Sequence, residues 1–138
     1  MSEVACSKEL GYNLGIKLIR GAYMNEERAL AQLHGYESPV WDSIEETHQC
    51  YDDCLHHVIS NLEANSCLFI ASHNANSVQK AKEAILERGF KDHRVRFGQL
   101  KAFSDQITGQ LAQENFKVYK YLPYGPTEKV MPYLIRRG

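Results

Sequence analysis

The sequence predicts an α/β protein in which parallel strands alternate with helices. Short apolar runs recur about every 30 residues, and the segments between them carry apolar residues at the three- and four-residue spacing of amphipathic helices. Four such units follow one another, which implies parallel pairing through right-handed crossovers. Two architectures fit: an open doubly wound sheet, or half of an eight-stranded barrel of roughly 250 residues. The glycine-rich phosphate fingerprint that would favour the open sheet is missing, because Gly11 and Gly15 precede a strand.

The first half of the chain is expected to hold one strand and two helices. The apolar run at 14–19 suits a buried strand, and a short helix is expected at 25–33. Gly, Ser, Pro and Asp then indicate a loop at 35–43. Ser43 and Glu46 form a capping box that starts a long helix to about residue 63. Its apolar residues predict one buried stripe: Ile44, Tyr51, Leu55, Val58, Ile59 and Leu62.

The second half repeats the alternation three times. Gly89 stands where a left-handed residue ends a helix, and Pro123 to Pro126 form a turn. The expected elements are a strand at 67–71, a helix from Asn76 or Ser77 to about Gly89, a strand at 94–100, a helix at 104–114, a strand at 117–122 and a helix capped by Thr127 that stops at Arg137.

The composition excludes several classes of function. The chain is 43% hydrophobic and 24% charged with a net charge of -1, which is typical of a globular protein and argues against nucleic-acid binding. Its apolar runs are far shorter than the roughly 20 residues of a membrane-spanning helix. The first eight residues carry no targeting signal, and four scattered cysteines need no disulfide scaffold, which fits a reducing compartment.

A zinc site is the one metal hypothesis that the sequence raises. Cys50 and Cys54 stand four residues apart on an expected helix, with His48, His56 and His57 nearby. Structural zinc sites normally use a tighter cysteine pair and a second pair elsewhere, and no second pair exists. We therefore interpret the two cysteines as small helix residues and expect no metal.

Polar and aromatic side chains gather where the expected strands end, which is where parallel α/β folds collect their chemistry. No serine or cysteine nucleophile with a base, and no pair of acids, stands there. Arginines can instead grip a carboxylate or phosphate, and tyrosines can pack against a compact apolar body. The set predicts a small anionic substrate beside a cofactor. Its members are Arg20, Gly21, Ala22, Tyr23, Ser72, His73, Asn74, Gly98, Gln99, Leu100, Tyr121, Tyr124, Gly125, Tyr133, Arg136 and Arg137.

Each of these residues also has a purely structural interpretation. Arg136 and Arg137 end a helix, where basic side chains commonly meet the helix dipole. His73 is typical of a turn residue bonded to its own backbone, and Tyr121 and Tyr133 are typical core or rim aromatics. Lys17 differs, because it lies inside an apolar strand and a buried lysine needs a polar partner.

Four segments resemble, in order and spacing, the motifs of the proline dehydrogenase family. They are 17–23 (Lys-Leu-Ile-Arg-Gly-Ala-Tyr), 71–74 (Ala-Ser-His-Asn), 121–125 (Tyr-Leu-Pro-Tyr-Gly) and 133–137 (Tyr-Leu-Ile-Arg-Arg). The resemblance covers nearly the whole chain from Leu14 and is closest to the eukaryotic branch, which includes hydroxyproline dehydrogenase. It implies a partial (β/α)8 TIM-type barrel: 14–138 would be its C-terminal half, about the last four β/α units, and 1–13 the end of a preceding helix and a linker.

The resemblance implies an FAD enzyme that oxidises L-proline to 1-pyrroline-5-carboxylate and passes electrons to quinone. It further implies a mitochondrial protein, with peripheral association of the full-length enzyme with the inner membrane. On the substrate side, the resemblance implies that the carboxylate is clamped by Arg136 and Arg137, that the proline ring is lined by Tyr121 and Tyr133, and that the pocket is closed by Tyr23 and Leu100. On the cofactor side, it implies that the isoalloxazine is contacted by Arg20, Gly21 and Ala22, and the flavin also by Ser72, His73 and Asn74. Lys17 stands where many bacterial members carry an arginine near the flavin.

Two departures from the family pattern bear on activity. Residues 98–103 read Gly-Gln-Leu-Lys-Ala-Phe where the family usually has Gly-Gln-Leu-Leu-Gly-Met, so this loop is expected to differ. The family's earlier strands, with a lysine and an aspartate at the site, and its segment after the arginine pair are absent. A half barrel leaves two strand edges unpaired, so we expect the chain alone to be poorly stable or self-associated, with little proline oxidation.

Two alternative functions remain. One is hydroxyproline dehydrogenase, although the bulky Tyr121 favours proline over a hydroxylated ring. The other is a non-catalytic fragment that pairs with another chain, which bound flavin would argue against.

Overall fold

Ten helices and strands follow one another along the part of the chain that the structure, a computed structural model, describes: residues 3–64, 66–89 and 94–135. In chain order they are α1 (Glu3–Leu10), β1 (Gly15–Ile19), α2 (Met24–His34), α3 (Ile44–Asn61), β2 (Cys67–Ala71), α4 (Ala75–Glu87), β3 (Val95–Leu100), α5 (Asp105–Gln113), β4 (Lys117–Tyr121) and α6 (Thr127–Ile135).

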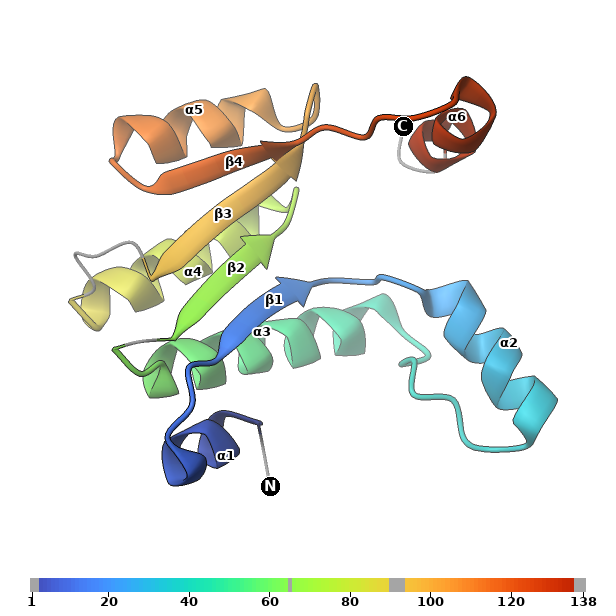
Figure 1. Cartoon of the computed structure of the whole chain (residues 1–138), viewed down its shortest axis with the longest axis horizontal. Coiled ribbons are helices and arrows are strands. Elements are labelled where there is room, and N and C mark those ends of the chain that lie inside the picture. Colours follow the sequence, from blue (N-terminus) through green and yellow to red (C-terminus); the bar gives the residue numbers. More distant parts are fainter. Residues whose placement is uncertain (1–2, 65, 90–93, 136–138) are drawn as a thin grey trace.

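The strands form one parallel sheet whose spatial order, β1-β2-β3-β4, follows the chain. Helices α3, α4 and α5 lie along the strands as an outer layer, while α2 and α6 lie beyond the carboxyl ends of β1 and β4 (Figure 1). A doubly wound sheet reverses its strand order, whereas a barrel adds each strand beside the last. The sequential order therefore excludes the open doubly wound alternative and matches a partial β/α barrel.

The hydrophobic core lies between the sheet and this outer layer. Alternate strand residues point into it, so Leu68, Ile70 and Phe97 are fully buried. From α3, the core takes the predicted stripe, with one exception: Ile44 is 63% exposed. As the first residue of α3, Ile44 precedes the turns that pack on the sheet. The stripe prediction is confirmed from Tyr51 onward.

The opposite face of the sheet, which we call the open face, is covered by none of the described helices. Its side chains come from the alternate strand positions, where Lys17, Phe69 and Arg96 share one register row. Ile19 and Tyr119 are exposed on it. Lys17 is exposed as well, so the expectation of a buried lysine is wrong. The sequence predicts that Lys17 lies in a strand, but it does not show which face of the resulting sheet the helices cover.

The helix ends test the predicted caps. The capping box is confirmed: the Glu46 amide donates to Ser43 Oγ at 3.1 Å, and Glu46 accepts from the Ser43 amide. The next helix begins at Ala75, earlier than expected, because Asn74 Oδ1 accepts from the Ser77 amide and is its cap. Gly89 has the expected left-handed conformation, with φ 65°.

The last helix also departs from its prediction. Thr127 is the first residue of α6 and not a residue ahead of it, and Pro132 lies inside the helix. The predicted end at Arg137 lies outside the described residues. In the part of the chain that is described, no helix is long and apolar enough to cross a membrane.

Candidate active site

Arg20, at the end of β1, points toward the helix layer. Its Nη1 donates to Ser77 Oγ at 3.1 Å, and its guanidinium lies 5.7 Å from the centre of the Tyr51 ring. Burial raises the pKa of Tyr51 to about 12, although the nearby arginine charge opposes that rise. Arg20 thus lies on the side of the sheet opposite to Lys17, so the structure separates two residues that were expected at one cofactor.

The connection from β1 to α2 exposes small residues and one large ring. Gly21 has a φ of 65° and Tyr23 a φ of 60°, so the chain turns sharply over three residues. Gly21 and Ala22 are exposed, and Tyr23 is 72% exposed at the start of α2. The backbone here is open to a flat ligand, since no bulky side chain covers it.

His73, which follows β2, is held in one orientation by β3 and the loop after it. The Leu100 amide approaches Nε2 at 3.4 Å, and Nδ1 lies 3.0 Å from Ser104 Oγ. An amide can only donate, so Nε2 accepts and Nδ1 carries the proton, which it donates to Ser104. Burial, and secondly the charge of Lys120, lower the pKa of His73. The lowered pKa favours the neutral ring, and His73 is exposed to solvent.

The neighbours of His73 are engaged within the protein. Ser72 is buried; its hydroxyl accepts from the Asn74 amide at 3.1 Å, and its carbonyl accepts from Gln99 Nε2 at 3.3 Å. Gln99 Oε1 in turn accepts from Thr108 Oγ1 at 3.1 Å. These hydrogen bonds connect the end of β2 to β3 and α5. Ser72 and Asn74 therefore stabilise the fold, whether or not they also contact a ligand.

Lys120 is a residue at this end of the sheet that the sequence reasoning missed. From β4 its Nζ donates to the Phe103 carbonyl at 2.7 Å and pairs with Asp105 at 2.6 Å. The loop it holds has left-handed backbone at Ala102 and Ser104. Lys120 thereby fixes the loop that supplies the Ser104 hydroxyl to His73. The sequence does contain a signal for Lys120: it is a charged residue at a strand position whose side chain faces the helices, where a charge needs a polar partner.

The end of β4 brings together three of the expected substrate residues. Leu100 and Tyr121 are register partners on β3 and β4, and Leu100 is buried. The Tyr121 and Tyr133 rings meet edge to face, with their centroids 6.4 Å apart at 62°. Tyr133 comes from α6, so this contact ties α6 to the sheet. Arg136 and Arg137 lie outside the described residues.

The structure therefore groups His73, Leu100, Tyr121 and Tyr133 along the carboxyl ends of β2, β3, β4 and the adjoining α6. Tyr23 and Lys17 belong to β1 and the connection after it, at the other edge of the row of strands. The group offers an oriented neutral imidazole and an aromatic wall.

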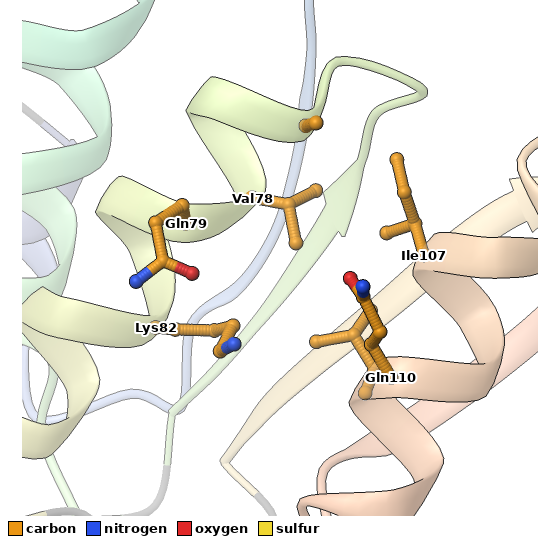
Figure 2. A pocket seen from close by; sticks show the side chains of 7 residues that line it. Val78, Gln79, Lys82, Ile107 and Gln110 are labelled. Atoms are coloured by element: carbon orange, nitrogen blue, oxygen red, sulfur yellow. The ribbon is translucent and has the colours of Figure 1, made fainter.

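Two hollows lie elsewhere. One lies between α4 and α5, where Val78, Gln79 and Lys82 face Ile107 and Gln110 (Figure 2). Its volume of ≈ 30 Å³ has room for water and not for a substrate. The other is a groove beside β1 with apolar walls from α1, β1 and α3: Val4, Leu14, Ile16 and Val58.

The cysteine pair on α3 forms no metal centre with described neighbours. Within residues 3–64, 66–89 and 94–135, no three His, Cys, Asp or Glu side chains are grouped to hold an ion. Burial, and secondly the neighbouring Cys50, raise the pKa of the Cys54 thiol, which disfavours the thiolate that metals bind.

Comparison with known proteins connects these features to one family. The family model described as "Proline dehydrogenase" matches residues 1–138. Human "Proline dehydrogenase 1, mitochondrial" is 43% identical over 140 residues, which is 99% of this chain and 23% of that protein. Human "Hydroxyproline dehydrogenase" is 44% identical over 132 residues, or 93% of this chain and 29% of that protein.

Solved structures agree on the fold. Proline utilization A from Bdellovibrio bacteriovorus, inactivated by N-propargylglycine, superposes with a TM-score of 0.85 at 22% identity, covering 97% of this chain and 14% of that one. At this identity the likeness shows the barrel-type fold alone. The chain spans less than a third of the length of the curated relatives it matches.

Proposed function

The chain belongs to the proline dehydrogenase family, and on this basis we propose that it forms the C-terminal part of an FAD-dependent enzyme that oxidises L-proline to 1-pyrroline-5-carboxylate. In this proposal residues 14–138 supply about the last four β/α units of a barrel, and residues 1–13 supply the end of a preceding helix and a linker. The observation that carries the proposal is the edge-to-face pair of Tyr121 and Tyr133 beside Leu100, at the end of the sheet where such barrels bind substrate.

The residues present fit a flavin. Gly21 and Ala22 are small and exposed, so a flat ring can approach their backbone. The His73 ring is oriented by two hydrogen bonds, and the residue is exposed to solvent. Lys17 contributes a positive charge on the open face, where no strand residue carries a carboxylate that would repel the anionic groups of FAD. Ser72, Asn74 and Arg20 would complete the cofactor side, although Arg20 in this structure points to the helix layer.

The chain's own residues would bind and orient proline. Tyr121 and Tyr133 would pack against the ring, while Tyr23 and Leu100 would exclude water from it. Arg136 and Arg137 would clamp the carboxylate bidentately, so that the aromatic wall selects which ring carbon faces the cofactor. FAD, when bound, would supply the hydride acceptor for oxidation of the ring carbon beside the nitrogen.

The proposed cellular location rests on the names of the relatives, and the proposed electron acceptor rests on the family resemblance. Human and Caenorhabditis elegans relatives carry the name "Proline dehydrogenase 1, mitochondrial". We extend this location to the present protein and assign quinone as its electron acceptor, with peripheral association of the full-length enzyme with the inner membrane.

A chimera tests the proposal. Human proline dehydrogenase 1 would receive this chain in place of its own matching segment, with the parent enzyme as control. We expect a flavin-loaded protein that reduces a quinone when proline is added. A folded, flavin-loaded chimera that oxidises neither proline nor hydroxyproline would overturn the assignment. The 138-residue chain alone is expected to purify without yellow flavin absorbance and to oxidise little proline.

Two other functions are weighed against this one. Hydroxyproline oxidation is favoured by the 44% identity to human hydroxyproline dehydrogenase and opposed by the phenol of Tyr121 at the ring site. A non-catalytic role in pairing with another chain is favoured by the uncovered sheet face. Turnover of the chimera on both substrates separates the first from proline oxidation, and a folded chimera that binds no flavin would favour the second.

A further inference from the structure

The segment from the end of β3 to the start of α5 contacts the His73 ring at three points. The Leu100 amide lies 3.4 Å from Nε2, and Ser104 Oγ lies 3.0 Å from Nδ1. The Phe103 ring meets the imidazole edge to face, with centroids 5.7 Å apart at 65°. Residues 100–104, which we call the His73 loop, therefore determine how this histidine is oriented at the carboxyl end of the sheet.

Ser104 contacts His73 instead of capping the helix that follows it. It directly precedes α5, where a serine normally accepts a hydrogen bond from a backbone amide of the helix. Its backbone is left-handed and not extended, and its side chain makes no capping hydrogen bond. The hydroxyl accepts from His73 Nδ1 instead. The local preference of the sequence is thus overridden at this residue, which points to a requirement at His73.

The backbone of the His73 loop is strained. Ala102 has a φ of 69° and Ser104 a φ of 54°, a conformation that residues other than glycine rarely adopt. Strained residues of this kind persist only where the surrounding structure holds them, and they cluster at functional sites. The loop therefore depends on contacts from outside itself.

Lys120, on β4, supplies those contacts at both ends of the loop. Its Nζ donates to the Phe103 carbonyl at 2.7 Å and more weakly to the Leu100 carbonyl at 3.5 Å, and it pairs with Asp105 at 2.6 Å. An ammonium group has three N–H donors, so these three oxygens use all of them. The hydrogen bonds of Lys120 are thus made to the His73 loop and to the first residue of α5.

Both ring nitrogens of His73 are consequently engaged within the protein. Nδ1 carries the proton and donates to Ser104, while Nε2 accepts from the Leu100 amide. Neither nitrogen is then free to exchange a proton with a ligand, so a ligand would meet the imidazole through its ring carbons. This arrangement is typical of a residue that fixes position and not of an acid or a base.

We propose that Lys120 and Ser104 are positioning residues of the flavin site, which act through the His73 loop to hold His73 in one orientation and in its Nδ1-protonated form. The imidazole then fixes the place of the flavin relative to the proline ring without exchanging a proton with it. This inference rests on the proposed function, which assigns the flavin contact to His73. Lys120 and Ser104 themselves touch neither cofactor nor substrate in this arrangement.

Lys120→Met in the chimera with human proline dehydrogenase 1 tests the proposal, because it removes the ammonium group and keeps an apolar stem. We expect the nitrogen NMR shifts of His73 to move from the Nδ1-protonated form toward a mixture of both tautomers, and the visible bands of the bound flavin to shift. In anaerobic mixing, the rate at which proline bleaches the flavin should fall about tenfold, as expected for misplaced reacting groups. The Kd of proline should stay within about twofold, because its binding groups are unchanged.

Lys101→Met is the matched control. It makes the same substitution at an exposed lysine of the same loop, and it should leave the tautomer, the flavin bands and the bleaching rate unchanged. Ala102→Gly in the Lys120→Met background should recover part of all three, because glycine adopts the left-handed backbone without strain. A general loss of stability would not be repaired in this way.

The proposal would be overturned if the His73 tautomer or the flavin readouts stayed at their unsubstituted values in Lys120→Met, or if Lys101→Met gave the same losses. Should Lys120→Met fail to fold or to bind flavin, Ser104→Ala replaces it with the same expected and contrary outcomes. An unsubstituted chimera that binds flavin but oxidises no proline would overturn the proposed function alone, because the nitrogen shifts and the flavin bands still report on His73. A chimera that binds no flavin would overturn both.

Discussion

The ring of Tyr121 at the end of β4 meets the ring of Tyr133 on α6 edge to face, 6.4 Å between centroids. Such a pair contributes ~0.5–1.5 kcal/mol beyond the apolar area it buries. It is a contact between a strand and the helix that follows it, and it brings α6 back to the strand ends. Tyr121 is 57% exposed while Tyr133 is half-buried, so Tyr121 is the ring that a ligand can reach.

Tyr121→Ser should shift the substrate preference of the chimera toward hydroxyproline. The smaller side chain removes the phenol that crowds a hydroxylated ring, and it leaves space and a hydroxyl in its place. We expect the ratio of kcat/KM for hydroxyproline over proline to rise by about tenfold, within the range that one pocket group provides. Steady-state kinetics on both substrates measures it.

Tyr121→Phe is the control for that substitution. It keeps the ring and its contact with Tyr133, so the ratio should stay near the wild-type value. An unchanged ratio in Tyr121→Ser, with Tyr133 still in place, would show that Tyr121 does not set the choice between the two substrates.

Stability should fall at mildly acidic pH because of His73. Burial lowers the pKa of this histidine below its ordinary value, so the folded state favours the neutral ring. The resulting stabilisation is complete above the pKa of an unfolded histidine, about 6.5, and is lost as the pH falls through that value toward the lower folded pKa. Urea unfolding from pH 8 to pH 5 should show a loss in the wild type that His73→Gln reduces.

Lys120→Met extends this prediction. The lysine charge contributes to lowering the pKa of His73, and its removal should raise that pKa in an NMR titration of the ring. The same substitution frees the Phe103 carbonyl and Asp105, so the loop should exchange its amide protons faster. A histidine pKa that falls or stays constant in Lys120→Met would contradict the assigned cause.

The fold followed from the sequence because its signals are local. Alternation in the strands and the capping box at Ser43 depend on neighbouring residues, and the structure confirms both. The side of the sheet on which Arg20 lies could also have been predicted. Arg20 is two residues after Leu18 and four after Ile16, and both of these face the helices, so alternation places Arg20 on the same side. Resemblance instead placed Arg20 with the cofactor. The exposure of Lys17 depends on what covers a distant face, which no local pattern encodes.

Ser43→Ala should lower the free energy of unfolding by about 1 kcal/mol. The substitution removes the acceptor for the Glu46 amide and ends the reciprocal bond from the Ser43 hydroxyl to Glu46. Urea unfolding measures the loss, and Ser38→Ala, in the exposed loop before α3, is the comparison. An effect of Ser43→Ala no larger than that of Ser38→Ala would mean that the cap adds nothing to the stability of α3.

Gly98 is the glycine whose replacement should cost most, because Phe69 lies across it. A Cβ at Gly98 would stand 2.4 Å from Phe69 Cε1, and the same ring leans against Tyr119 with centroids 6.0 Å apart. Gly98→Ala therefore forces the ring off its place, and we expect a loss of ~1–3 kcal/mol in urea unfolding. Phe69→Leu in the Gly98→Ala background should recover part of it, since the shorter side chain clears the new methyl group.

Gly109→Ala is the comparison for Gly98→Ala, because it should raise the free energy of unfolding instead of lowering it. Gly109 lies within α5, and a Cβ there would meet no atom within 4 Å. Alanine should stabilise this helix by ~0.5–1 kcal/mol, because it lowers the backbone entropy of the unfolded chain without a clash. If Gly98→Ala did not lower the free energy of unfolding, the Phe69 ring would not pack against β3. The open face would then lack the contact between the Phe69 and Tyr119 rings that links β2 to β4, beside the positive charges of Lys17 and Arg96.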